Sequence, residues 1–188
     1  MALTDRFRWD ERYHTRTVPP PGLPDVFAPF ERLFPKTGVG LDLACGLGAV
    51  SVWLAARGLD VLAVDVSPVA IRRARELARR EGIDCRFEVF DLDGGLPPGP
   101  DADVIFCHKF RDCRLDAAVI ERLAPGGLLA ISALSEVGAQ PGPFRVSAGE
   151  LPTAFAGLRQ IAGGECGGEA WLLARRIEQR QSRCFHPR

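Results

Sequence analysis

The residues best suited to chemistry lie in and after the segment LDLACGLGAV, residues 41–50. A strand that runs into closely spaced glycines and then a helix can hold the polar end of a nucleotide-like ligand. The backbone approaches the ligand closely at Gly46 and Gly48, and the helix presents free N–H groups. Asp65 ends the next expected strand, 17 residues after Gly48, where a carboxylate can accept both hydroxyls of a ribose. These residues predict an adenosine-containing ligand.

Two details separate the candidate ligands. A dinucleotide-binding turn counted from Gly46 would have a third glycine at the position of Ser51, and no Gly-Lys-Ser/Thr of a phosphate loop follows. Asp42 lies just before the turn, where a carboxylate repels a pyrophosphate and attracts an ammonium group. The turn therefore favours S-adenosylmethionine, which has a cationic amino acid end and no phosphate. An NAD-dependent oxidoreductase is the disfavoured alternative.

A second group of candidates begins at the end of the strand expected at 102–108. His108 lies where a methyl acceptor should meet the cofactor, and histidine is the usual base near neutral pH. The alternative is a histidine that is only hydrogen-bonded at a strand end. Lys109 and Arg111 follow closely and would attract an anionic acceptor. Their alternative is a solvated loop, the usual place for surface charge.

Two further segments are expected to border the same pocket. Trp9, Tyr13 and Arg16 lie in the N-terminal arm, for which a mobile end is one alternative. In proteins that this chain resembles, such an arm folds over the cofactor, which implies that these residues cap it and contact its carboxylate. Glu136 and Arg145 lie in the loop after the strand expected at 126–134 and are candidate acceptor contacts. The lack of a catalytic triad does not argue against an enzyme, because a sulfonium methyl group is already activated and positioning can suffice.

The elements that must position these residues follow from alternating strand and helix patterns, which predict an α/β fold with a parallel sheet, helices on both faces and an antiparallel edge. One domain over 1–188 is expected, with an arm rather than a packed layer at 1–22 and a flexible tail at 178–188. The expected strands are 39–45, 60–66, 85–91, 102–108 and 126–134, with a hairpin of 158–165 and 169–177; the expected helices are 25–34, 49–58, 67–82, 115–124 and 148–157.

Composition narrows the function classes. The formal net charge is +0, and the arginines of the helix at 67–82 alternate with glutamates on its polar face, so no nucleic-acid partner is expected. The six cysteines form no CxxC pair and no zinc-binding spacing, so no metal is expected. The start of the chain lacks the apolar segment of a signal peptide, and the longest uncharged run, residues 43–56, is too short to span a membrane. A soluble, cytoplasmic protein with reduced cysteines is expected.

At this point the chain resembles the class I S-adenosylmethionine-dependent methyltransferases. The resemblance covers roughly residues 37–135 and rests on five segments in order: LDLACGLGAVSVWLA, VLAVDVSPVAI, FEVFDLDG, ADVIFCH and RLAPGGLLAIS. It implies that Asp65 binds the ribose, that Asp91 accepts from the adenine amino group and that Leu92 offers it a backbone N–H. Ala44 departs from the family, which often has glycine there. The full expected cofactor set is Asp42, Ala44, Cys45, Gly46, Gly48, Asp65, Val66, Asp91, Leu92 and Cys107, with the arm residues Trp9, Tyr13 and Arg16.

Within this class the chain is similar to the tellurite-resistance-type methyltransferases, through RYHTRT (12–17) and GPFRVSAGEL (142–151). The resemblance implies a Rossmann-like, seven-stranded, mostly parallel sheet of order 3-2-1-4-5-7-6. It also implies methyl transfer to a small-molecule acceptor, a chalcogen oxyanion, a thiol or a similar compound, with S-adenosyl-L-homocysteine as the product. A monomer or a homodimer is expected. A cofactor-binding protein without catalysis remains the other alternative.

Overall fold

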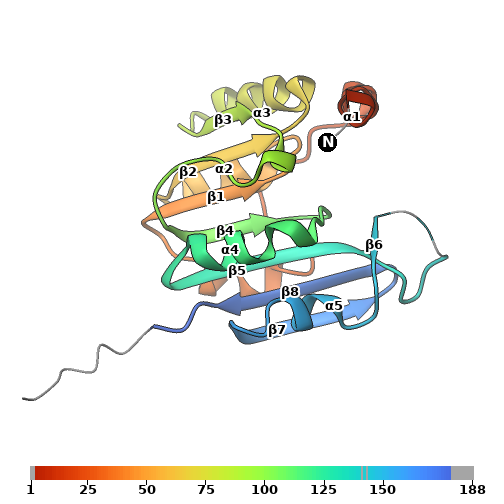
Figure 1. The fold of residues 1–188 in the computed structure, drawn as a ribbon. Coiled ribbons are helices and arrows are strands. Elements are labelled where there is room, and N and C mark those ends of the chain that lie inside the picture. Colours follow the sequence, from red (N-terminus) through yellow and green to blue (C-terminus); the bar gives the residue numbers. More distant parts are fainter. Residues whose placement is uncertain (1–2, 141, 143, 179–188) are drawn as a thin grey trace, which may run out of the picture.

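A twisted eight-stranded sheet forms the centre of the part of the chain that the computed structural model describes, residues 3–140, 142 and 144–178 (Figure 1). The strand order is β3-β2-β1-β4-β5-β8-β7, and β6 pairs with the end of β5. Only β8 runs antiparallel to its neighbours β5 and β7. This order confirms the predicted 3-2-1-4-5-7-6, because the strands predicted as the sixth and seventh are β7 and β8 here. The short strand β6, which pairs with β5, was not predicted and shifts their numbers by one. The strands are β1 (Val39–Leu43), β2 (Asp60–Asp65), β3 (Arg86–Val89), β4 (Ala102–Cys107), β5 (Leu123–Ser135), β6 (Arg145–Val146), β7 (Arg159–Cys166) and β8 (Glu169–Arg175).

Helices cover both faces of this sheet, as the alternating pattern predicts. The apolar side chains of α2 and α3 pack on one face, against Val61, Ala63 and Phe106. Those of α4 and α5 pack on the other, against Leu43, Ile105 and other residues of the same strands. Successive strand residues thus enter opposite cores, as in any sheet buried on both faces. The helices are α1 (Leu3–Thr15), α2 (Ala49–Ala56), α3 (Pro68–Glu81), α4 (Asp116–Arg122) and α5 (Glu150–Ala154), with short 3-10 turns η1 (Ala28–Leu33), η2 (Leu92–Gly94) and η3 (Cys113–Leu115).

The helix expected at 67–82 shows how local sequence sets an element. The Ser67 hydroxyl accepts a hydrogen bond from the Ala70 N–H at 3.1 Å, which caps the first turn of α3. Pro68 begins the helix, where its missing N–H is not needed. Gly82 ends it with φ of 68°, a conformation that suits glycine. Caps at both ends are why the sequence predicts this helix closely.

The segment 25–34 departs from prediction. A helix is expected there, but the structure has a turn followed by the 3-10 helix η1, whose N-cap is Phe27. Pro24 precedes this short stretch and Pro29 lies within it, and a proline has no N–H to donate to a helical ladder. The aromatic residues therefore anchor the segment by packing. Phe27 is fully buried and meets the Phe106 ring edge-on at 5.4 Å between centroids.

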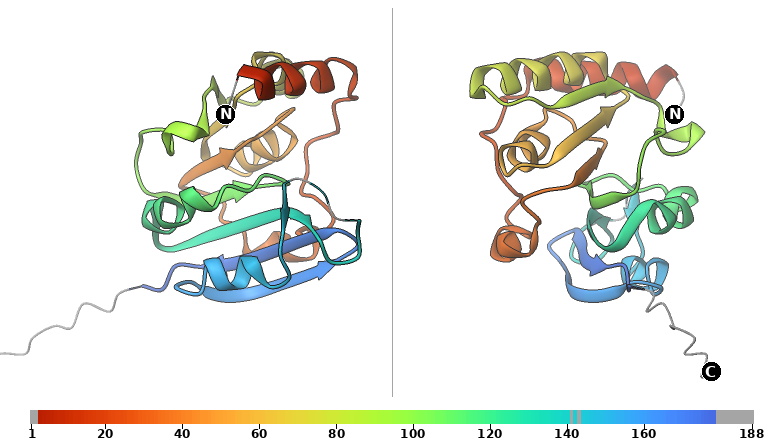
Figure 2. Two further views of the ribbon diagram at one scale, coloured as in Figure 1. Left: turned by 45° about the vertical axis from the view of Figure 1, so that its right-hand side comes forward. Right: turned by 90° about the vertical axis from the view of Figure 1, so that its left-hand side faces the viewer.

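The prediction of an unpacked arm at 1–22 is wrong. Residues 3–15 form α1, which lies beside α3 (Figure 2). Asp10 accepts from the Ser67 hydroxyl, and the Arg73 guanidinium donates to the carbonyl oxygens of Tyr13 and Arg16. Tyr13 is 8% exposed. A helix of this length is marginal by itself in water, so α1 depends on these contacts with α3.

The C-terminal hairpin forms as predicted. Gly167 and Gly168 join β7 to β8 with φ of 61° and 81°, the backbone that a tight two-residue turn requires. The tail expected to be flexible lies outside the described residues beyond Glu178. Among the helices of the described ranges, none combines the length and apolar character needed to cross a membrane.

Candidate functional site

The turn between β1 and α2 lies at the carboxyl edge of the sheet. Ala44, Gly46 and Gly48 all take positive φ, of 53°, 53° and 79°. A side chain at Gly48 would meet the Ala74 Cβ at 2.7 Å and the Phe87 ring at 3.0 Å. The close packing thus explains why a glycine is needed at position 48, in addition to the close ligand approach expected from the sequence. Ala44 carries a Cβ in a conformation that an L-residue seldom adopts.

Asp65 is fastened to this turn. Its Oδ2 accepts from the Gly46 N–H at 2.9 Å, and its Oδ1 accepts from the Ser67 N–H at 2.9 Å. Burial raises the Asp65 pKa to about 6, against the lowering effect of these backbone hydrogen bonds. A carboxylate offers about four lone-pair sites, so these backbone hydrogen bonds leave room for a hydroxyl donor of a ligand. The carboxylate is therefore both fixed in orientation and able to accept more hydrogen bonds.

Asp42 lies deeper than Asp65. Its side chain is 2% exposed, and its Oδ2 accepts from the Ser51 hydroxyl at 2.6 Å. Burial raises the Asp42 pKa to about 7, the Ser51 hydrogen bond lowers it, and the charge of Asp65 raises it further. Ser51 lies where a dinucleotide-binding turn would have its third glycine, and its hydroxyl thus stabilises the ionised carboxylate of Asp42. Because two buried carboxyl groups lie beside one turn, a positively charged ligand group placed there would favour their ionised forms.

Helix α1 covers the turn from outside. The hydroxyl of Tyr13 lies 3.0 Å from the position that a Cβ on Gly46 would occupy. Trp9 stacks on Tyr13 at 5.7 Å, and both pack with Leu47. Arg16 follows the helix, and its charge lowers the pKa of His108, so the arm reaches toward the end of β4 as well.

His108 lies just past the end of β4, beside β5 and β8. Its Nδ1 is 2.7 Å from the Ser132 Oγ and 3.8 Å from the Glu169 Oε1. The Lys109 ammonium lies 3.4 Å from the Glu169 Oε2. Burial lowers the His108 pKa to about 4, helped by Lys109 and Arg16 and opposed by Glu169. The imidazole is therefore neutral at neutral pH.

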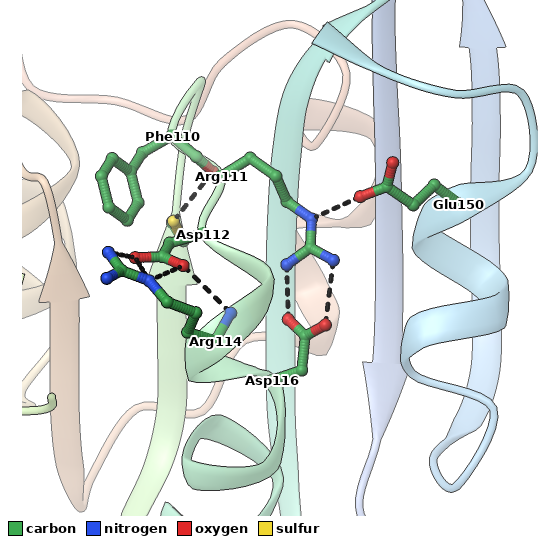
Figure 3. Close-up of polar contacts among 7 residues, drawn as sticks. Phe110, Arg111, Asp112, Arg114, Asp116 and Glu150 are labelled. Atoms are coloured by element: carbon green, nitrogen blue, oxygen red, sulfur yellow. Dashed lines mark hydrogen bonds and ion pairs between the residues drawn. The ribbon is translucent and has the colours of Figure 1, made fainter. Parts of the chain in front are cut away.

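Arg111 lies elsewhere, on the face that carries α4 and α5 (Figure 3). Its guanidinium is paired with the Asp116 carboxylate by two hydrogen bonds and with the Glu150 Oε1 at 3.0 Å. The side chain is only 9% exposed. These two carboxylates neutralise the charge of Arg111 and join the loop after β4 to α4 and α5. The expected contact of Arg111 with an acceptor stays a prediction.

The remaining candidates border the same edge of the sheet. Asp91 caps η2 by accepting from the Asp93 N–H at 3.0 Å and is exposed, whereas Leu92 is buried. Glu136 is exposed, and Arg145 donates to the carbonyl oxygens of Ser135 and Gly168. Arg145 thus secures the loop after β5 to the hairpin turn.

Three further candidates sit close to the strands. Cys45 is half-buried in the turn, and Val66 follows Asp65. The Cys107 side chain is buried on the α4 face, with its Sγ 3.4 Å from the Phe110 carbonyl oxygen. It points away from the face of His108, so the backbone is the part of Cys107 left to face a ligand. Within the described ranges no group of three His, Cys, Asp or Glu side chains is arranged to hold a metal ion.

Comparisons with known proteins agree with this geometry. Residues 41–127 match the family model of a methyltransferase domain. The ribosomal RNA small subunit methyltransferase C of Alcanivorax borkumensis is 34% identical over 111 residues, 54% of this chain and 34% of that protein. TehB of Haemophilus influenzae has a TM-score of 0.73 at 20% identity, over 91% of this chain and 66% of TehB. The N-methyltransferase NodS of Bradyrhizobium japonicum, in complex with S-adenosyl-L-homocysteine, has a TM-score of 0.68 at 19% identity, over 92% of this chain and 99% of NodS.

Residues 41–127 thus match a methyltransferase domain, and the chain has the fold of S-adenosylmethionine-dependent methyltransferases. The matched region contains the turn, Asp42, Asp65, Asp91 and His108. The chain spans only 34% of the length of the curated rRNA methyltransferase that it matches. What the relatives act on is therefore no guide by itself to the acceptor of this chain.

The residues at this turn fit S-adenosylmethionine, the cofactor of the proteins that share the fold. Asp65 keeps lone pairs for ribose hydroxyls, and Asp42 with Asp65 provides the acidic surroundings that an amino acid ammonium favours. Ser132 and Glu169 are residues that the sequence did not single out. The signal lies in the strand register: Cys107 pairs with Ile131 in β5, so His108 comes beside Ser132. That register becomes visible only once the strand order is known.

Proposed function

We propose that this chain transfers a methyl group from S-adenosylmethionine to a small-molecule acceptor. The observation that carries the proposal is the Asp65 carboxylate, held at the end of β2 by the N–H groups of Gly46 and Ser67 beside the glycine turn. When bound, the cofactor supplies an activated methyl group on a sulfonium sulfur. The protein must then hold the donor and the acceptor in line and exclude water.

The proposed cofactor site runs along the carboxyl ends of β1, β2 and β3. Asp65 accepts from the ribose hydroxyls, Asp42 favours the ammonium group electrostatically, and Asp91 accepts from the adenine amino group. Leu92 offers the base a backbone N–H, as a buried residue at the start of η2 can. The other proposed contacts are Ala44, Cys45, Gly46, Gly48, Val66 and the backbone of Cys107, with Trp9, Tyr13 and Arg16 covering the site from the arm.

The proposed acceptor site is the region around His108. Lys109 is half-exposed there, and Arg16 adds a second positive charge. Glu136 and Arg145 border it from the loop after β5. The acceptor classes include thiols and chalcogen oxyanions, as the resemblance of RYHTRT and GPFRVSAGEL to the tellurite-resistance-type methyltransferases implies. The balanced net charge of the chain supports a small molecule over a nucleic acid. We place this single-domain protein in the cytoplasm, as a monomer or homodimer.

Calorimetry with S-adenosyl-L-homocysteine and with NAD tests the cofactor. We expect binding of the first alone. Asp65→Ala should abolish it by removing the ribose acceptor, while Asp60→Ala, at the opposite end of the same strand and exposed, should leave it unchanged. Binding of NAD alone would instead establish the oxidoreductase alternative.

Labelled cofactor tests catalysis. Methyl transfer from radiolabelled S-adenosylmethionine is measured across thiols, amines, phenols, selenite and tellurite. We expect at least one of these acceptors to be methylated at a rate that falls with Asp65→Ala. Cofactor binding without transfer to any of them would favour the non-catalytic alternative.

A further inference from the structure

Three neighbouring strands bring polar side chains together at the end of β4. In the parallel pair β4–β5, Cys107 lies opposite Ile131, which sets His108 beside Ser132. In the antiparallel pair β5–β8, Leu134 lies opposite Glu169 and Ser132 opposite Trp171. Residues directly opposite in a sheet share a face, and residues two apart along a strand share it too. His108, Ser132 and Glu169 therefore stand on one face, with His108 beside Ser132 and Glu169 diagonal to Ser132.

The hydrogen bonds of Ser132 leave little freedom to the histidine ring. Ser132 is fully buried, and its Oγ accepts from the Lys109 N–H at 3.2 Å. The same Oγ lies 2.7 Å from the His108 Nδ1. A hydroxyl has two lone pairs, so an Nδ1–H donor would fill the second. In that direction the hydrogen bond leaves Nε2 free of a proton, whereas a Ser132 hydroxyl that donates to Nδ1 would leave the proton on Nε2.

Glu169 decides between the two tautomers. Its Oε1 is buried without a hydrogen-bond partner among the described residues and lies 3.8 Å from the His108 Nδ1. A negative charge at that distance favours a proton on Nδ1 over one on Nε2. The other oxygen, Oε2, is paired with the Lys109 ammonium at 3.4 Å, which holds the carboxylate in place.

The charges around the His108 ring set its protonation state. Lys109 from the end of β4 and Arg16 from the arm disfavour the imidazolium, and Glu169 from β8 favours it. Burial adds to the first effect, so the ring is neutral at rest. A neutral ring with a free Nε2 can accept a proton, provided that a nearby carboxylate balances the charge which then appears.

We propose that Ser132 and Glu169 are positioning residues that prepare His108 to receive a proton from the acceptor, and that the acceptor is a thiol, amine or hydroxyl compound. This inference rests on the proposed function. The nucleophilic atom of the acceptor forms its bond to the methyl carbon as the carbon–sulfur bond breaks, and that electron pair remains on sulfur. Positive charge passes to the nucleophilic atom, which releases its proton to the Nε2 of His108. The imidazolium donates through Nδ1 to Ser132, and Glu169 neutralises it.

Nitrogen NMR of the histidines tests the arrangement without any acceptor. The chain has three histidines, so His108 can be assigned by its loss in His108→Asn. We expect the Nδ1–H tautomer in the wild type. Glu169→Gln should shift the population toward Nε2–H and lower the His108 pKa, because it removes the negative charge. Glu121→Gln changes an exposed residue of α4 and should change neither the tautomer population nor the pKa of His108. A wild-type Nε2–H tautomer, or no response to Glu169→Gln, would overturn the proposal.

Kinetics test the acceptor class. A thiol, an aromatic amine and a phenol are compared with selenite and tellurite. Glu169→Gln and Ser132→Ala should lower kcat for the first three by about tenfold or more and leave the KM for S-adenosylmethionine unchanged. The acid limb of the kcat/KM profile should move to lower pH in Glu169→Gln, an effect that a purely structural role would not produce.

The outcomes separate this proposal from the one on which it rests. Turnover of the oxyanions alone, or unchanged kcat in both variants, would contradict the proton transfer while leaving the methyltransferase function intact. Failure of the wild type to bind S-adenosyl-L-homocysteine in calorimetry would contradict the function itself. If none of the five acceptors is methylated, the tautomer measurement alone decides on the arrangement of Ser132, Glu169 and His108.

Discussion

Asp42 lies one residue before the end of β1 and Asp65 lies at the end of the neighbouring β2, and both carboxyl groups are removed from water. Burial raises the pKa of Asp42 to about 7 and that of Asp65 to about 6, although each is hydrogen-bonded. A nearby ammonium would restore the ionised forms. Affinity for a ligand with such a group should therefore rise with pH over the range in which these carboxyls ionise.

The variant Asp42→Asn tests the cost of burying this carboxyl group through the pH dependence of the unfolding free energy. Between the unfolded pKa near 3.8 and the folded value of about 7, the folded state holds the extra proton, so the contribution of Asp42 to stability declines as pH rises. Asparagine has no such proton. We expect the unfolding free energy of Asp42→Asn to fall less steeply over this range, by up to about 1.4 kcal/mol per pH unit. Urea unfolding of the ligand-free protein at several pH values measures it, and parallel curves for both proteins would contradict it.

Ala44 is a second residue under strain, because its φ is 53° where a glycine would be comfortable. Ala44→Gly should stabilise the protein by about 0.5–1 kcal/mol, the relief of the backbone exceeding the added entropy of the unfolded chain. Ala55→Gly, inside α2, should instead destabilise by about 1 kcal/mol. Chemical denaturation compares the two variants, and a loss of stability in Ala44→Gly would show that the turn depends on its methyl group.

At the scale of elements, α1 departs most from the sequence prediction, which had an unpacked arm in its place. It joins the N-terminus of α3 through Asp10 and Ser67, and its Tyr13 packs over the turn. The same hydroxyl of Ser67 caps α3 and contacts α1, so a single residue couples the two helices. The position of α1 on the site therefore depends on the cap of its neighbour.

Asp10→Ala should loosen α1. We expect a loss of about 0.5–1.5 kcal/mol in stability, faster proteolysis within residues 3–15, and weaker binding of S-adenosyl-L-homocysteine. Glu11→Ala changes the exposed adjacent residue of the same helix and should have none of these effects. Equal proteolysis rates for the two variants would show that α1 is held by other contacts.

Elements with capped ends and regular patterns were predictable, and elements held by distant contacts were not. Ser67, Pro68 and Gly82 specify α3 locally. For α1, the contacts lie more than fifty residues away in sequence, and no local pattern reports them. The same holds at the site: the turn and its acids follow from their order along the chain, whereas Glu169 reaches His108 through the pairing of β8 with β5. The two-residue β6 likewise exists by pairing with β5.

At the scale of the whole molecule, polar contacts outside the two cores connect elements that lie far apart in the sequence. Arg111 connects the loop after β4 to α4 and α5, and Arg73 connects α3 to the arm. The proposed cofactor site lies along the sheet edge that these connections border. A ligand there contacts several elements at once, so its binding should be felt by global unfolding.

Thermal unfolding measures that linkage. At about 100 times its Kd, S-adenosyl-L-homocysteine should add about 2.7 kcal/mol to stability, which corresponds to a rise in Tm of roughly 5–10 °C for a chain of this size. NAD at the same concentration should give no rise. Asp65→Ala should respond to neither compound, and a shift that survives in this variant would place the ligand elsewhere.

The docking of Tyr13 against Gly46 has a temporal consequence. On the proposed function, a product seated on the turn lies beneath α1 and leaves only after the helix has moved away. That movement must break the contacts of Asp10 and Arg73 with α3 and its cap. The residence time of the spent cofactor is then governed by an opening rate of the protein, and a pre-steady-state burst of methylated product would precede the slower steady state.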